Sequence, residues 1–133
     1  MKDLVQNRTE LMNQLIMDQA EAHLGQDIRL IPMDPRLGIS DYFIIMTARN
    51  KNHAQALADY IEEALMKEHF QVRAVDGYKE GSWILMDCED TLVHIFTQTQ
   101  RDYYDLEGIW DNKEALSEQI HQKQHHSQAN LER

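Results

Sequence analysis

The chain has 133 residues, of which 42% are hydrophobic and 27% are charged, an ordinary composition for one folded domain with a single core. No apolar run is long enough to cross a bilayer, and the formal net charge of −10 opposes binding to nucleic acid and favours a basic partner. The opening MKDLVQNRTELM lacks the residue order of a secretory signal, and the lone cysteine, Cys88, permits no internal disulfide, so we expect a cytoplasmic protein.

The first two elements predicted along the chain are a helix and a strand. The helix covers residues 3–23, where apolar side chains recur with helical spacing and form one stripe: Leu4, Leu11, Met12, Leu15 and Ile16. Residues 27–33, DIRLIPM, alternate as in a strand, with Pro32 near an edge or an end. The following DPRLGIS has the composition of a turn.

The middle and last elements complete an α/β pattern. YFIIMT, residues 42–47, is continuously apolar, which indicates a strand covered on both faces, and residues 51–69 predict an amphipathic helix capped by Asn50. Residues 71–78, 82–88 and 91–98 predict three strands, the last two forming a hairpin. A short helix should begin with Thr99 as its cap and stop near Gly108.

These elements predict a single α/β domain, in which a mixed sheet of about five strands is flanked by helices. We place this domain at residues 1–112. The remaining residues 113–133 are polar and glutamine-rich, which predicts a partly helical or disordered tail.

Acidic and aromatic residues are concentrated before this tail, in the stretch RDYYDLEGIWDN at residues 101–112. Residues 75–112 carry nine acidic and two basic side chains, a net charge of −7. Consecutive helical side chains point about 100° apart, so Tyr103 should pack inward with Leu106 and Trp110. Tyr104 should share a contact face with Arg101 and Asp105. The alternative is an ordinary Arg101–Asp105 surface pair with Tyr104 lying flat beside it.

The strand SWILMD has a related composition. Alternation places Trp83, Leu85 and Asp87 on one face of the sheet and aliphatic or sulfur-containing side chains on the other. A tryptophan and a carboxylate with only one aliphatic residue is unusual for pure core, so this face is a candidate partner-binding patch beside Tyr104. In the alternative interpretation, Trp83 is buried beneath the last helix and Asp87 simply ends the strand.

Four short motifs in a fixed order make the chain resemble a known family. They are S-D-Y-F at residues 40–43, G-x-W-x-L-x-D at 81–87, V-H-I-F at 93–96 and R-x-Y-Y-D-L-E-x-x-W at 101–110. From about Leu4 to Trp110 the chain is similar to the ribosomal silencing factor family, also called the Iojap-like family, and the tail lies outside this resemblance.

The resemblance implies a non-catalytic protein with a fold similar to that of nucleotidyltransferases. It also implies binding to the large (50S) ribosomal subunit at its ribosomal protein number fourteen, which blocks association with the small subunit and represses translation under nutrient limitation. Little direct nucleic-acid binding is implied, and related domains indicate a homodimer.

Carried over to this sequence, the family's partner-facing motif positions are Trp83, Leu85, Asp87, Arg101, Tyr104, Asp105, Leu106 and Glu107. Three further motif positions, Asp41, Tyr42 and His94, are assigned to the fold, His94 as a hydrogen-bonded core histidine. The chain departs from the family at residues 47–54, where a T-G-x-S-x-R-H pattern retains only its histidine, His53.

An enzyme is the main alternative function. Nucleotidyl transfer needs clustered carboxylates to hold Mg²⁺, and Asp87, Glu89 and Asp90 could supply them, although no Gly-Ser loop opens a helix nearby. Residues 121–126 contain three histidines with one helical i, i+4 pair but no third firm zinc ligand. Cys88 lies among acids, which disfavours a thiolate nucleophile. We therefore expect neither a cofactor nor a metal.

Overall fold

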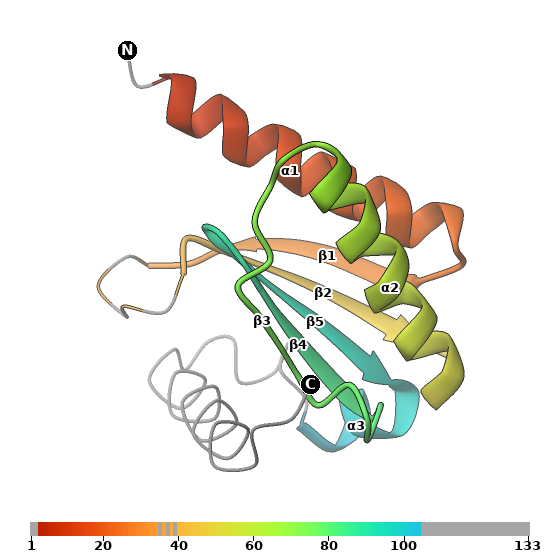
Figure 1. Cartoon of the computed structure of the whole chain (residues 1–133). Helices are drawn as coiled ribbons and strands as arrows, with labels where there is room; N and C mark the ends of the chain where they lie inside the picture. Colours follow the sequence, from red (N-terminus) through yellow and green to blue (C-terminus); the bar gives the residue numbers. More distant parts are fainter. Residues whose placement is uncertain (1–2, 35, 37, 39, 105–133) are drawn as a thin grey trace.

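The structure is a computed structural model, and it describes residues 3–34, 36, 38 and 40–104. Its elements in chain order are α1 (Asp3–Ala22), β1 (Gln26–Pro32), β2 (Tyr42–Ala48), α2 (Lys51–Lys67), β3 (Ala74–Asp76), β4 (Trp83–Cys88), β5 (Thr91–Thr97) and α3 (Gln98–Tyr104). Figure 1 shows α1 and α2 lying across the same face of the sheet. Within the described residues, no helix is both long enough and apolar enough to span a membrane.

The sheet has the mixed, five-stranded architecture that the sequence predicts. Its strand order is β1-β2-β5-β4-β3; β2 and β5 are parallel, whereas the other neighbours are antiparallel. The predicted β4–β5 hairpin is confirmed, with Cys88 opposite Thr91 and only Glu89 and Asp90 between them. Glu89 adopts a left-handed backbone conformation with φ of 52°, which lets the chain reverse in two residues.

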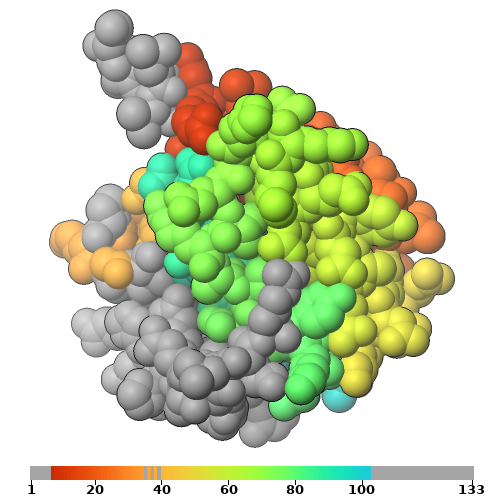
Figure 2. Space-filling model, viewed as in Figure 1, coloured from red at the N-terminus to blue at the C-terminus, as the bar shows by residue number. Residues whose placement is uncertain are grey.

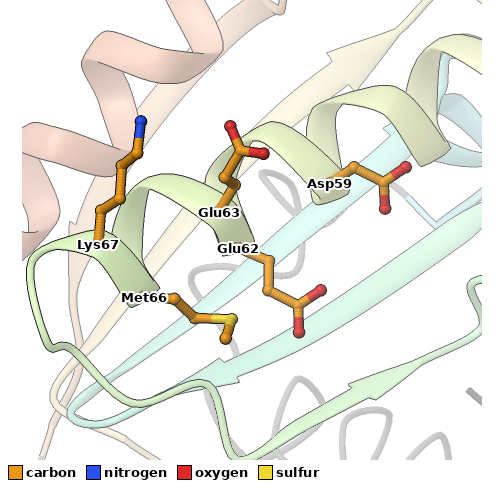
Figure 3. Close-up of a pocket in the computed structure, with 5 residues that line it drawn as sticks. All are labelled: Asp59, Glu62, Glu63, Met66 and Lys67. Carbon is orange, nitrogen blue, oxygen red and sulfur yellow. The ribbon is translucent and has the colours of Figure 1, made fainter.

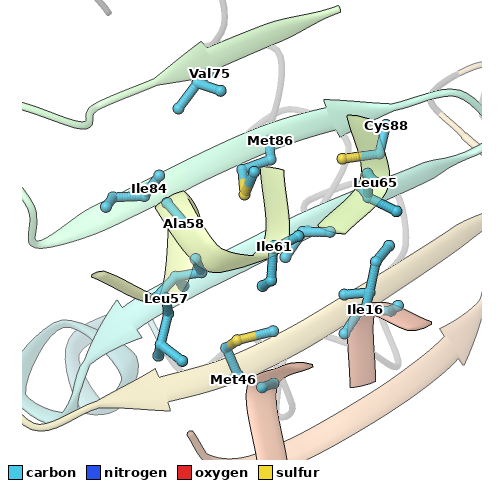
Figure 4. Packing of buried hydrophobic residues seen from close by; sticks show 14 of the residues in the cluster. Ile16, Met46, Leu57, Ala58, Ile61, Leu65, Val75, Ile84, Met86 and Cys88 are labelled. Atoms are coloured by element: carbon cyan, nitrogen blue, oxygen red, sulfur yellow. The ribbon is translucent and has the colours of Figure 1, made fainter. Parts of the chain in front are cut away.

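Helix α2 forms as predicted because both its cap and its periodicity are present. The Asn50 side chain accepts a hydrogen bond from the His53 backbone N–H at 2.9 Å. The helix buries one stripe against the sheet, namely Ala54, Leu57, Ala58, Ile61 and Leu65. Figure 4 shows the part of this stripe from Leu57 to Leu65 beside Ile84 and Met86 of β4. Met46 of β2 and Ile16 of α1 belong to the same cluster. In the space-filling view, α2 and the segment that follows it form the centre and right of the visible surface (Figure 2).

Helix α1 is present, but one residue of its predicted apolar stripe is wrong. Met12 and Ile16 are fully buried, whereas Leu11 is 67% exposed. The buried side of α1 includes two polar residues, Thr9 and Asn13. Thr9 donates a hydrogen bond to Asp90, and Asn13 accepts one from Thr91. These bonds to the β4–β5 turn and to β5 orient α1 so that Leu11 faces outward.

The edges of the sheet refine three further predictions. Pro32 ends the edge strand β1, as expected, and a β-bulge lies between Gln26 and Arg29. The predicted strand over residues 71–78 is shortened to Ala74–Asp76 at the opposite edge. Helix α3 begins at Gln98, directly after β5, so Thr99 lies inside the helix and not at its cap.

Candidate functional site

The face of the sheet opposite α1 and α2 carries a layer of aromatic side chains, and we call it the aromatic face. It consists of Phe43 and Ile45 of β2, Trp83 and Leu85 of β4, and His94 and Phe96 of β5. The register sets Trp83 opposite Phe96 and Leu85 opposite His94. Ring centroids are 4.9 Å apart for Trp83 and Phe96 and 4.6 Å apart for Phe43 and His94. The predicted alternation of Trp83, Leu85 and Asp87 on one face is therefore confirmed.

A buried hydrogen bond joins two members of this layer. The indole N–H of Trp83 donates to Nδ1 of His94 at 3.2 Å, and His94 is fully buried. Because Nδ1 accepts this hydrogen bond, the neutral ring carries its proton on Nε2. His94 is thus a hydrogen-bonded core histidine, as the sequence predicted.

The three β4 residues assigned to partner binding differ in exposure. Trp83 and Leu85 are 5% and 1% exposed, which agrees with the interpretation of Trp83 as a buried residue. The Asp87 side chain is 36% exposed, and its Oδ1 lies 3.7 Å from Nη1 of Arg73. Partial burial raises the pKa of the Asp87 carboxyl, and the nearby Arg73 charge only partly opposes that shift. Asp87 is therefore the one of these three residues that reaches the surface.

Helix α3 directs Arg101 into the protein. Its guanidinium is buried and donates hydrogen bonds from Nη1 to Thr47 Oγ1 at 2.6 Å and to the Asp27 carbonyl at 2.9 Å. Both interpretations of the sequence placed Arg101 at the surface, either on an outward contact face or in a pair with Asp105. Its buried position contradicts both. Tyr104 ends α3, and its side chain, together with the predicted sites Asp105, Leu106 and Glu107, lies outside the described residues, as does the expected packing of Tyr103 and Trp110.

The acidic residues of the β4–β5 turn have separate structural partners. Glu89 accepts hydrogen bonds from the Gln71 backbone N–H at 2.8 Å and from Arg8 at 3.1 Å, while Asp90 accepts one from Thr9 at 3.0 Å. Slight burial acts to raise the pKa of Glu89, but these donors outweigh it and the pKa is lowered. Across residues 3–34, 36, 38 and 40–104, no three His, Cys, Asp or Glu side chains are grouped to hold a metal ion. The three tail histidines lie outside these residues.

Cys88 has the unreactive environment that the sequence indicated. Its thiol is fully buried on the helix-covered side of β4. Burial raises its pKa strongly, and the charges of Asp87, Glu62 and Glu89 raise it further.

A shallow pocket of about 500 Å³ lies on α2, away from the aromatic face. It is lined by Asp59, Glu62, Glu63, Met66 and Lys67, and Figure 3 shows these side chains spreading outward from one helix. Within the described part of the chain, no residue assigned to partner binding lines it.

The divergent segment at residues 47–54 has a structural role that the sequence analysis missed. His53 Nδ1 accepts a hydrogen bond from the Arg49 backbone N–H at 2.9 Å, and its Nε2 donates to the His23 carbonyl at 2.8 Å. The His23 ring also stacks on Tyr60 of α2, with the centroids 3.6 Å apart. His53 thus links the start of α2 to the end of α1. Its position three residues after the cap Asn50, as in a capping box, was the available signal.

Comparisons with known proteins agree with this geometry. Residues 6–133 match the family model described as ribosomal silencing factor during starvation, so the match extends past Trp110, beyond the segment whose motifs carried the resemblance. A Bacillus subtilis protein named ribosomal silencing factor is 33% identical over 86 residues, which are 65% of this chain and 73% of that protein.

Two further relatives are more distant. The mouse protein named mitochondrial assembly of ribosomal large subunit protein 1 is 26% identical over 91 residues, 65% of this chain but 39% of that protein. A crystal structure of a Chromobacterium violaceum protein is similar with a TM-score of 0.72 and 25% identity, over 77% of this chain and 85% of that one. Because the family model covers nearly all of its residues and its fold is shared with such relatives, this chain belongs to the ribosomal silencing factor family.

Proposed function

We propose that this protein binds the large (50S) ribosomal subunit through ribosomal protein number fourteen and sterically blocks association with the small subunit. It would thereby repress translation in the cytoplasm under nutrient limitation, without catalysis. The observation that carries this proposal is the family match over residues 6–133. The name of the mouse relative, which refers to assembly of the large ribosomal subunit, supports the choice of subunit.

The charge of the chain favours a protein contact over an RNA contact. A net charge of −10 gives no gain from counterion release on ribosomal RNA, whereas an acidic surface attracts a basic ribosomal protein. Nine of the 23 acidic side chains fall within residues 75–112, the segment that holds both assigned motifs. Docking through this segment would keep the remaining surface away from phosphate.

Within this segment we assign different roles to exposed and buried residues. Asp87, Asp105 and Glu107 would pair with Lys or Arg side chains of the partner, and Tyr104 and Leu106 would supply apolar anchoring. Trp83 and Leu85, which are 5% and 1% exposed, would form the rigid layer beneath this contact. The ribosome-binding domain is proposed to end near residue 112.

The test is sedimentation of the purified protein with isolated large and small subunits, with subunit joining measured in the same gradients. Wild type should comigrate with the large subunit alone and reduce joining. Tyr104→Ala should lose about 2 kcal/mol of binding free energy, roughly thirtyfold in affinity, if Tyr104 is an interface anchor. Tyr60→Ala is the matched control, because Tyr60 is 43% exposed on α2, across the sheet from the aromatic face.

Three outcomes would contradict the proposal. Wild type that fails to comigrate at moderate salt would remove the ribosomal function, and unchanged binding by folded Tyr104→Ala would remove the site. Metal-dependent turnover of a nucleoside triphosphate that disappears in Asp87→Asn would establish the enzymatic alternative. Sedimentation of the free protein reports whether it forms the expected homodimer.

A further inference from the structure

Arg101 occupies an unusual position for a residue assigned to a partner-facing motif. It belongs to a seven-residue helix, yet its side chain is only 5% exposed. A buried guanidinium is costly to desolvate, so it must be held by hydrogen bonds in defined directions. Two acceptors are supplied by strands that lie 54 and 74 residues earlier in the chain. These two hydrogen bonds therefore link the position of α3 to strands β1 and β2.

Each acceptor is itself placed by the sheet. Thr47 lies on β2 opposite Gln26 of β1 and Phe96 of β5, at the end of the sheet where β5 leads into α3. Its side chain is 1% exposed, so its hydroxyl can contact Arg101 but not a partner protein. The first acceptor therefore ties α3 to β2, an interior strand between β1 and β5.

The second acceptor comes from the bulge in β1. Asp27 lies between Gln26 and Arg29, where the register shifts, and has a φ of 47°. This left-handed conformation is uncommon outside glycine, although aspartate tolerates it better than most residues. Its carbonyl oxygen accepts the second Arg101 hydrogen bond. One guanidinium thus fastens α3 to the edge strand β1 and to its interior neighbour β2.

We propose that Arg101 is a positioning residue for partner binding and not a contact residue. A helix of seven residues is too short to be stable alone, so its orientation depends on such anchoring. By fixing α3 against β1 and β2, Arg101 sets the position of the helix that leads into the partner-facing motif. This inference rests on the proposed function for its binding consequence, but the anchoring itself is independent of the ribosome.

Hydrogen exchange tests the anchoring without any ribosome. Thr47→Val and Arg101→Gln should each raise the exchange rates of the amides in residues 98–104 by about tenfold, because each removes a buried hydrogen bond that holds α3. The matched control is Thr91→Val, since Thr91 is a fully buried threonine whose hydroxyl donates to Asn13 at the opposite end of β5. That control should leave α3 exchange unchanged. Equal effects of all three variants on α3 would overturn the inference.

Large-subunit binding by folded protein tests the consequence. Thr47→Val and Arg101→Gln should each weaken binding several-fold, and the double variant should be no weaker than Arg101→Gln alone, because both act through one link. Thr91→Val should bind as wild type. Additive losses, or a Thr47→Val variant that binds as wild type while Arg101→Gln fails, would make Arg101 a direct contact. Wild type that does not bind would remove the proposed function, and the exchange result would still decide the anchoring.

Discussion

The two faces of the sheet are built from different kinds of interaction. The face beneath α1 and α2 is lined by aliphatic and methionine side chains, including Ile44, Met46, Ile84 and Met86, which pack without directional bonds. The aromatic face instead holds stacked rings, the Trp83–His94 hydrogen bond and the buried guanidinium of Arg101. Burial on the first face stabilises the fold through apolar contacts. Directional contacts on the second fix one arrangement of the chain leading into α3.

The largest expected effect on stability comes from the helix-covered face. Ile61 is fully buried at the centre of α2, so Ile61→Ala should lower the free energy of unfolding by about 2–5 kcal/mol through lost burial and a residual cavity. Urea denaturation measures this change. Large-subunit binding at a temperature where the variant is folded should remain near wild type. A variant that keeps its stability but loses binding would reverse the roles of the two faces.

A smaller but more specific effect is expected on the aromatic face. Trp83→Phe keeps a ring in the layer but removes the indole N–H that donates to His94 at 3.2 Å. The loss of this donor should cost about 1–3 kcal/mol, measured by urea denaturation. Unlike Ile61→Ala, the folded variant should also bind the large subunit more weakly. Unchanged stability and unchanged binding would show that the Trp83–His94 bond does not shape this face.

The contribution of the β4–β5 turn to stability should depend on pH through Glu89, which lies on neither face of the sheet. Because the folded pKa of Glu89 is lowered, its contribution to stability is present above the ordinary glutamate pKa of about 4.3 and is lost as pH falls through the folded value. The stability difference between wild type and Glu89→Gln should be largest above about pH 5 and should shrink on acidification. Chemical denaturation across this range measures it. In an Arg8→Gln background the difference should become smaller, and a difference that grows at low pH would contradict the assigned sign.

The smallest effect is expected at Leu11, the apolar residue that α1 leaves in solvent. Since it is 67% exposed, Leu11→Gln should change the free energy of unfolding by no more than about 0.5 kcal/mol. Ile16→Gln, five residues later, places a polar group in the core and should be severely destabilising. Thermal denaturation of the two variants side by side compares them. Similar losses would mean that Leu11 is covered in solution.

The helix-covered face was more predictable from sequence than the aromatic face. The boundaries of α2 follow from a local cap and a regular period, and the alternation along β4 follows from the geometry of any strand. Leu11 was misplaced because a helical period gives relative directions only, and the orientation of α1 depends on bonds from Thr9 and Asn13 to residues of the β4–β5 turn and β5.

Arg101 shows the same limit more strongly at the candidate site. Its spacing from Tyr104 predicted a shared outward face, but its acceptors are Thr47 and a backbone carbonyl presented by a bulge in β1. No local pattern encodes contacts across such sequence separations. The assignment of Trp83, Asp87 and Tyr104 to a partner came from family motifs, and the spacing of the residues supplied only their placement on one strand face and one helix.

The most direct test of the central claim compares charge reversals on opposite sides of the sheet. Asp87→Lys alters the partly exposed carboxylate on the same face of β4 as Trp83, whereas Glu63→Lys alters an exposed one on α2, and both change the net charge by two units. If the protein docks through residues 75–112, Asp87→Lys should weaken binding to the large subunit at least about tenfold, while Glu63→Lys should bind nearly as wild type does. Equal losses, or a larger loss for Glu63→Lys, would contradict docking through this segment.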